Sequence, residues 1–77
     1  MFWMKSYTYR IIIEPDGENY HGFVPALVGC HTYGSTIAET KKNLHDAMSL
    51  YIEHLREKGT LIPEENSLES FDTIVLA

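Results

Sequence analysis

The stretch that decides the fold is Tyr-His-Gly-Phe-Val-Pro-Ala-Leu-Val-Gly-Cys, residues 20–30, followed closely by Gly-Ser-Thr-Ile-Ala-Glu-Thr, residues 34–40. Pro25 has a fixed φ and no N–H to donate, so a strand that reaches it must stop or lie at a sheet edge. Thr36 and Glu39 have the spacing of a capping box, which satisfies N–H groups at the start of a helix. The stretch therefore predicts a strand, a short connection, a second strand and a helix start.

The residues before this stretch predict a hairpin. Aromatic and β-branched side chains alternate with others over residues 7–14, which favours a β-strand. Residues 15–18, Pro-Asp-Gly-Glu, are typical of a turn, because proline presets its φ and glycine accepts a positive φ. The chain is then expected to return as a second strand over residues 19–24, with a third short strand over residues 30–33.

A long helix is expected over residues 37–58, with Gly59 as its C-terminal stop. At 100° per residue, one broad face of this helix is expected to pack on the sheet. That face consists of Ile37, Thr40, Leu44, Ala47, Met48, Tyr51, Ile52 and Leu55. Leu50 lies well off this face and is expected to be exposed. A loop at residues 62–67 leads to a last expected strand over residues 71–76.

The order β-β-β-α-β predicts an α+β fold, a two-layer domain in which one helix packs on a mainly antiparallel sheet. The 77 residues make one domain, residues 1–77, with a single core. Ile12 lies on the polar side of the first strand, and the last strand has apolar residues on both faces. The second sheet face is therefore not expected to be fully exposed to solvent. We therefore expect another protein, or a second copy of this chain, to cover it.

Charge and composition exclude several classes of partner. The formal net charge is −5, and the six Lys and Arg residues form no basic stripe, so direct binding of nucleic acid is not expected. An acidic chain suits a basic protein partner. The single cysteine, Cys30, cannot form an internal disulfide, which favours a reducing, cytoplasmic location. No apolar run approaches the roughly 18 residues that span a bilayer, so no membrane association is expected.

The acidic residues do not form a catalytic pattern. A metal-dependent nuclease needs several carboxylates that converge on two metal ions. Glu14, Asp16 and Glu18 cluster at the expected turn, and Asp72 stands alone in the last expected strand. A solvated turn accounts for the cluster, and the chain is not expected to be an enzyme.

The histidines and the cysteine do not predict a metal or cofactor site either. His45 and His54 are nine residues apart on the expected helix, which places them about 180° from each other. Cys30 and His31 are neighbours in a strand, so their side chains point to opposite faces. Neither zinc-ligand spacing nor a Ser-His-Asp order is recognisable in the sequence.

The pattern of residues 20–40 resembles the hallmark of the HicB-like antitoxins, small acidic partner proteins of toxin–antitoxin pairs. It consists of Tyr20, then Val-Pro-x-Leu-x-Gly-Cys at residues 24–30, then Gly-x-Thr at residues 34–36. The resemblance runs from about residue 7 to residue 63 and implies a partial ribonuclease-H-like fold that commonly self-associates. Family members usually begin at a Met-Lys near the first strand, which implies that residues 1–4 contain an N-terminal extension.

This resemblance implies a binding protein that neutralises a small basic RNA-cleaving toxin, similar to HicA, by masking its active surface. Such a surface must attract phosphate, so an acidic protein competes for the same positive charge. The expected partner-binding residues are Glu14, Asp16 and Glu18 at the hairpin, with Tyr20 and Phe23 as aromatic anchors. A homodimer or higher homo-oligomer is also expected.

Two alternatives stay open at this point. Many HicB-like antitoxins continue into a C-terminal helix-turn-helix or ribbon-helix-helix segment that binds DNA, and none is recognisable before Ala77. A short form without that segment is therefore expected. The alternative function is a stand-alone homo-oligomeric scaffold or regulator without a cognate toxin. A short basic reading frame next to this one would favour the antitoxin.

Overall fold

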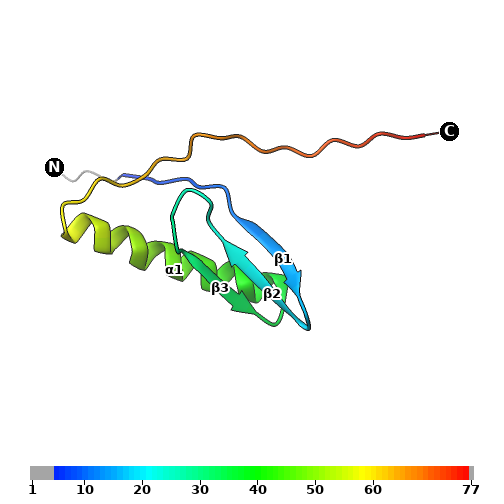
Figure 1. Ribbon diagram of the computed structural model, residues 1–77, viewed down its shortest axis with the longest axis horizontal. Coiled ribbons are helices and arrows are strands. Elements are labelled where there is room, and N and C mark those ends of the chain that lie inside the picture. The colour runs from blue at the N-terminus through cyan, green and yellow to red at the C-terminus, as the bar shows by residue number, and fades with distance from the viewer. Residues whose placement is uncertain (1–4, 77) are drawn as a thin grey trace.

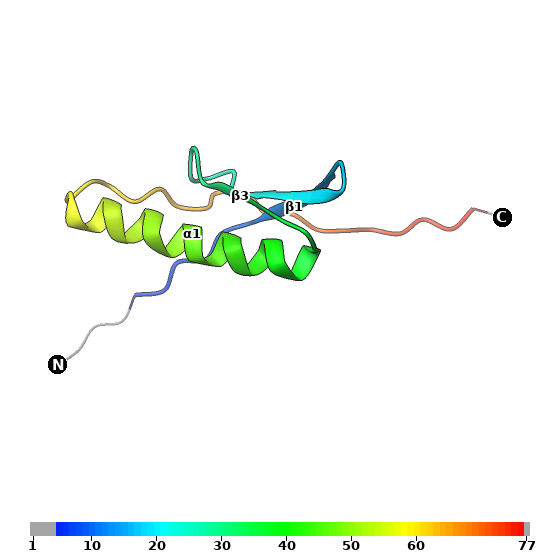
Figure 2. The same ribbon diagram turned by 90° about the horizontal axis from the view of Figure 1, so that it is seen from below.

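The computed structural model describes residues 5–76 and contains a three-stranded antiparallel sheet and one long helix (Figure 1). The strands are β1 (Ile12–Asp16), β2 (Asn19–Phe23) and β3 (His31–Gly34), and the helix α1 spans Ile37–Glu57. The sheet order is β1-β2-β3, so β1 and β3 are its edges. Figure 2 shows α1 along one side of the sheet. The expected α+β architecture, one helix on an antiparallel sheet, is confirmed.

The first strand of the β1–β2 hairpin begins and ends later in the chain than the sequence predicted, and the turn is shorter. The turn has only two residues, Gly17 and Glu18, because Asp16 pairs with Asn19. Gly17 has a φ of 63° and Glu18 does not share the positive φ, a combination typical of the type II′ turns that suit strand twist. β1 pairs with β2 only from residue 12, although the prediction began the strand at residue 7. It extends to Asp16 and so includes Pro15, which an edge strand tolerates.

The connection between β2 and β3 consists of two consecutive tight turns. The N–H of Leu27 donates to the carbonyl of Val24, and the N–H of Cys30 donates to that of Leu27, each at 3.0 Å. Pro25 occupies the second position of the first turn, and Gly29, with a φ of 81°, occupies the third position of the next. Val24, Leu27 and Cys30 point inward and are buried. The Val-Pro-x-Leu-x-Gly-Cys pattern therefore encodes this loop and its contribution to the core.

Capping residues set both ends of α1. The Thr36 hydroxyl accepts a hydrogen bond of 3.0 Å from the N–H of Glu39, as the capping box predicts. The Glu39 carboxylate accepts its bond from the Ser35 hydroxyl instead of completing the box. At the other end, Gly59 has a φ of 67°, and the N–H groups of Gly59 and Thr60 reach back to carbonyls in the last turn. The predicted helix is thus confirmed to within one residue.

The helix lies very close to the sheet at Thr40, which is fully buried. A Cβ added at Gly34 would lie 2.7 Å from the backbone nitrogen of Thr40, and one added at Gly22 would lie 2.9 Å from its methyl group. Both distances are shorter than a carbon side chain allows. Two glycines on neighbouring strands therefore permit this approach of α1.

The core lies between α1 and the sheet. Its buried members are Val24, Leu27, Cys30 and Leu44, with Tyr9, Ile11, Ala47, Met48, Tyr51 and Ile52 packed against them. The predicted apolar face of the helix is confirmed from Thr40 to Ile52. Leu55 is half-buried but lies outside the core cluster, and Ile37 is 55% exposed because it lies in the first turn. Leu50 is exposed, as predicted.

The last expected strand is not formed. Residues 60–76 contain neither helix nor strand, and in Figure 1 they run past the sheet without joining it. The radius of gyration is 15.4 Å, whereas a compact chain of this length has about 11–12 Å. The apolar pattern of residues 71–76 fits a strand, but a strand requires a neighbour, and this segment has none in the described chain.

No helix within residues 5–76 is long and apolar enough to cross a membrane.

We expect Leu44→Ala to lower the free energy of unfolding by about 2–5 kcal/mol, because it leaves a cavity where a fully buried side chain had packed. Leu50→Ala is the matched control, an exposed leucine on the same helix, and should change stability by no more than about 0.5 kcal/mol. Urea unfolding followed by circular dichroism measures both values. Equal losses in the two variants would contradict this description of the core.

We expect Cys30 to react slowly with alkylating reagents. Its side chain is 5% exposed, and burial raises the pKa of the thiol above its ordinary value. Iodoacetamide at pH 8 should therefore modify the folded protein about 100-fold more slowly than the unfolded chain. Because the folded pKa is the higher one, the thiol stabilises the fold fully below the unfolded pKa, and this contribution is lost as pH rises above it. Equal alkylation rates in buffer and in denaturant would show that Cys30 is accessible.

Candidate interaction surface

The face of the sheet opposite α1 carries no helix or strand among residues 5–76, and we call it the open face (Figure 2). A Cβ at Gly22 would point at Thr40 and Leu44, so the residues on either side of Gly22 point away from the helix. The strand register extends this alternation to the neighbouring strands. The open face consists of Ile12, Glu14, Asp16, Asn19, His21, Phe23, His31 and Tyr33.

An aromatic and imidazole cluster occupies one half of the open face. The His21 ring lies at its centre, stacked on Phe23 with centroids 5.5 Å apart and tilted on Tyr33 at 4.8 Å. The Nε2 atom of His21 is 3.3 Å from Nδ1 of His31, a distance at which one imidazole donates a hydrogen bond to the other. The cluster borders a shallow hollow of about 560 Å³ beside the loop that follows β2. This half of the face thus combines aromatic area with hydrogen-bonding groups.

The other half of the open face is acidic. Glu14 and Asp16 extend from β1, and Glu18 follows in the turn; all three are exposed. The Glu14 carboxylate is 4.0 Å from Nδ1 of His21, so it connects the acidic half to the aromatic one. The face therefore has a negative end at the hairpin and an aromatic end near the loop.

The structure brings together most of the residues that the sequence suggested for partner binding. Glu14, Asp16 and Phe23 share the open face, and Glu18 lies at its end. Tyr20 is separated from them, because it pairs with Gly34, whose Cβ position faces Thr40 on the helix side. Tyr20 therefore lies on the helix side of the sheet.

Sequence reasoning missed the pairing of the two histidines and Tyr33. His21 and His31 are far apart in the sequence, and only the register of β2 against β3 brings them together. The alternation within each strand was a usable signal, since His21 is two residues from Phe23 and His31 is two residues from Tyr33. What the sequence did not supply was the closed loop that sets the register.

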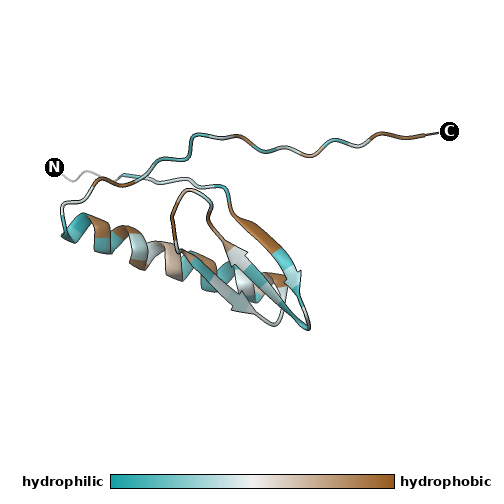
Figure 3. Ribbon diagram, in the orientation of Figure 1, coloured by the Kyte–Doolittle hydropathy of each residue, from teal (hydrophilic) through white to brown (hydrophobic). Residues whose placement is uncertain are grey.

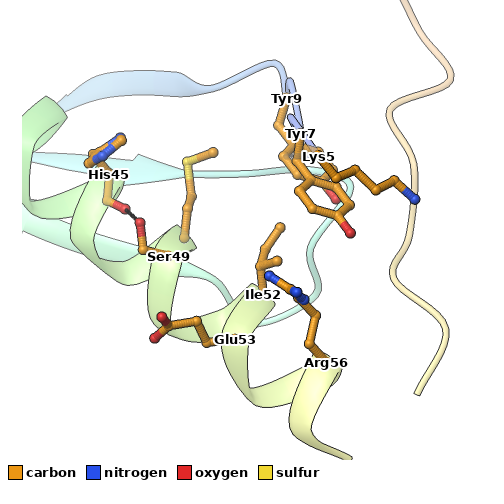
Figure 4. Close-up of a pocket in the computed structure, with 9 residues that line it drawn as sticks. Lys5, Tyr7, Tyr9, His45, Ser49, Ile52, Glu53 and Arg56 are labelled. Carbon is orange, nitrogen blue, oxygen red and sulfur yellow. Dashed lines mark hydrogen bonds between the residues drawn. The ribbon is translucent and has the colours of Figure 1, made fainter. Parts of the chain in front are cut away.

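A second, smaller hollow of about 300 Å³ lies between the N-terminal residues and the later turns of α1 (Figure 4). Lys5 and Arg56 contribute positive charges and Glu53 a negative one. Ser49 donates its hydroxyl hydrogen bond to a backbone carbonyl of the helix, which leaves no activated nucleophile there. Within residues 5–76, no three His, Cys, Asp or Glu side chains are grouped to hold a metal ion. The open face is therefore the stronger candidate for function.

Known proteins resemble this chain in sequence and in structure. The model of the HicB-like antitoxins of bacterial toxin–antitoxin systems matches residues 9–74. A UPF0150 protein of Synechocystis is 38% identical over 63 residues, which cover 80% of each chain. A UPF0150 protein of Thermoplasma acidophilum is 40% identical over 62 residues, which cover 79% of this chain and 90% of the other.

A solved structure agrees with these sequence matches. A chain in the complex of the HicA3 and HicB3 toxin–antitoxin proteins superposes with a TM-score of 0.65 and 32% identity, covering 77% of this chain and 69% of that one. The family match includes the sheet, the helix and most of the C-terminal segment. The chain belongs to the HicB-like antitoxin family of bacterial toxin–antitoxin systems.

Proposed function

We propose that this protein is an antitoxin that neutralises a small basic RNA-cleaving toxin by covering the toxin's RNA-binding surface with the open face. The observation that carries the proposal is the pairing, on one uncovered sheet face, of exposed carboxylates with a cluster of aromatic and imidazole rings. Family membership supports the class of partner, because the similar solved chain comes from a complex of HicA3 and HicB3.

The acidic half of the open face recognises the toxin's positive charge. A surface that binds RNA must attract phosphate groups, so it presents Lys, Arg or His side chains. Glu14, Asp16 and Glu18 offer carboxylates to the same groups, and the net charge of −5 steers the two proteins together. The same charge gives the isolated chain no basis for binding nucleic acid directly. The protein thus competes with RNA and needs no catalytic residue, metal or cofactor of its own.

The aromatic half of the open face supplies the anchor of the interface. Aromatic side chains at the centre of an interface contribute most of its binding energy. Phe23 is half-buried and Tyr33 is 52% exposed, and both border the hollow, which a partner side chain can fill. Tyr20, on the helix side, supports the sheet in this proposal and does not contact the toxin. The complex forms in the cytoplasm, where RNA is cleaved.

A second candidate function is a homo-oligomeric scaffold without a cognate toxin. The exposed apolar side chains of the C-terminal segment favour it, because they suit contacts between copies of the chain. The neighbouring reading frame separates the two functions. A short basic protein encoded there favours the antitoxin, and its absence favours the scaffold.

Reversing the hairpin charges should slow toxin capture without unfolding the protein. Asp16→Lys combined with Glu18→Lys changes exposed carboxylates, which contribute little to stability. We expect the association rate with the toxin to fall about tenfold or more at low salt and to lose most of its salt dependence. Glu53→Lys combined with Glu57→Lys, on exposed positions of α1, is the charge-matched control. Equal association rates in both double variants, measured by stopped flow at two salt concentrations, would exclude the hairpin from the interface.

Removing the aromatic anchor should affect dissociation instead. We expect Tyr33→Ala to raise the dissociation rate of the toxin about tenfold or more, because it removes ring contacts at the centre of the open face. Leu50→Ala removes an exposed apolar side chain from the helix and should leave this rate unchanged. Surface plasmon resonance measures both rates. An unchanged dissociation rate for Tyr33→Ala would place the interface elsewhere on the molecule.

A further inference from the structure

The C-terminal segment, residues 60–76, exposes a run of apolar side chains at its end. Phe71 is 96% exposed, Ile74 81%, and Val75 and Leu76 are each 88% exposed. Figure 3 shows this end of the chain as a hydrophobic stretch that extends beyond the sheet and helix. Single exposed apolar residues are common on protein surfaces, but a contiguous run of them marks a contact site.

The base of this segment is held in place, so its end projects in a defined direction. The Tyr9 hydroxyl donates a hydrogen bond to the carbonyl of Pro63, and the backbone N–H of Arg10 donates to the Glu65 carboxylate at 3.0 Å. The Arg10 guanidinium also lies 3.6 Å from the Glu69 carboxylate. The segment is therefore anchored beside the residues that lead into β1, and only residues beyond 69 are free of the domain.

A hydrogen bond from the Ser67 hydroxyl reinforces this anchor. It joins the Arg10 N–H on the Glu65 carboxylate, and the two bonds lower the pKa of that carboxyl group, the Ser67 bond most. The lowered pKa widens the acidic range over which the Glu65 carboxylate keeps accepting both bonds. The turn at Glu65 and Ser67 fixes the segment just before its apolar end.

The sheet offers an edge that matches this segment. β1 pairs with β2 on one side, and no strand of residues 5–76 pairs with its other side. A free edge presents unpaired N–H and C=O groups and is a template for another strand. The chain's own end does not occupy this edge, since it runs past β1 in Figure 1. The described chain thus contains a free sheet edge, on β1, and a strand-like segment, residues 71–76, that are not paired with each other.

The sequence at the end of the segment suits this edge. Residues 71–76, Phe-Asp-Thr-Ile-Val-Leu, are rich in aromatic and β-branched residues and carry one charge. Their length is typical of a strand, and β1 itself has five residues. Ile74, Val75 and Leu76 place apolar side chains on both faces of such a strand, so at least one apolar side chain faces α1 in either register.

We propose that residues 71–76 pair with the free edge of β1 in a second copy of this chain, and that the second copy's segment pairs with the first in return. The reciprocal exchange satisfies both open edges under twofold symmetry and therefore closes as a dimer. A one-way exchange would leave one edge free and would propagate into a filament. The exchange leaves the open face uncovered, so it does not rest on the proposed function and is compatible with toxin binding.

Cysteine cross-linking distinguishes exchange between copies from pairing within one chain. In a Cys30→Ala background, one protein carries Glu14→Cys on β1 and another carries Asp72→Cys or Ile74→Cys in the segment. After the two proteins are unfolded and refolded together, mild oxidation should give a disulfide-linked pair of twice 8.8 kDa. The variant that carries both cysteines should form little cross-linked monomer. A cross-linked monomer as its main product, or no cross-link between the two proteins at either segment position, would overturn the proposal.

The oligomeric state supplies an independent test. Ile74→Asp combined with Val75→Asp should raise the dissociation constant of the dimer at least about 100-fold in sedimentation equilibrium. Strand pairing would remove the new carboxylates from water, and that removal costs free energy. Leu61→Asp combined with Leu68→Asp removes two equally exposed leucines outside the pairing residues and should leave the dimer intact. Circular dichroism should show that both variants keep α1. A wild-type protein that is monomeric at micromolar concentration, or equal effects of the two double variants, would exclude the exchange.

Discussion

The close contact of α1 with β2 and β3 at Thr40 is the constraint on which the rest of the structure depends. Gly22 and Gly34 leave the room that this contact requires, and a side chain at Gly34 would collide with the helix backbone itself. The contact lies one turn after the cap at Thr36, so the helix is positioned almost as soon as it begins. Leu44 follows one turn later and reaches the centre of the core. Because α1 packs against this face of the sheet, only the opposite face is available for a partner.

The family hallmark and the candidate interface use different residues. Val24, Leu27 and Cys30 of the hallmark point into the core, and its proline and glycine shape the turns between them. The acidic and aromatic residues of the open face lie almost entirely outside the hallmark's fixed positions. The hallmark therefore identifies the scaffold, and under the proposed function the choice of partner would depend on the residues around it.

Local signals in the sequence predicted the elements that local interactions determine. The helix ends were predictable because Thr36 and Gly59 satisfy its terminal groups with their own neighbours. The start of β1 was not, since residues 7–11 have strand-like alternation but no partner strand. The same holds for residues 71–76, whose pattern describes a strand without specifying what it pairs with. The histidine pair depends on the register between β2 and β3, which residue types alone do not determine.

The projecting C-terminal segment also bears on how long the protein survives in a cell. Proteases cleave extended, exposed chain that they can bind without unfolding a domain. The end of the segment beyond residue 69 offers such a substrate in a single copy, whereas the sheet and α1 do not. We therefore expect proteolysis of an unassembled copy to begin in this segment, without global unfolding of the domain. A contact that covers the segment would protect it from cleavage, so resistance to proteolysis would then report on assembly.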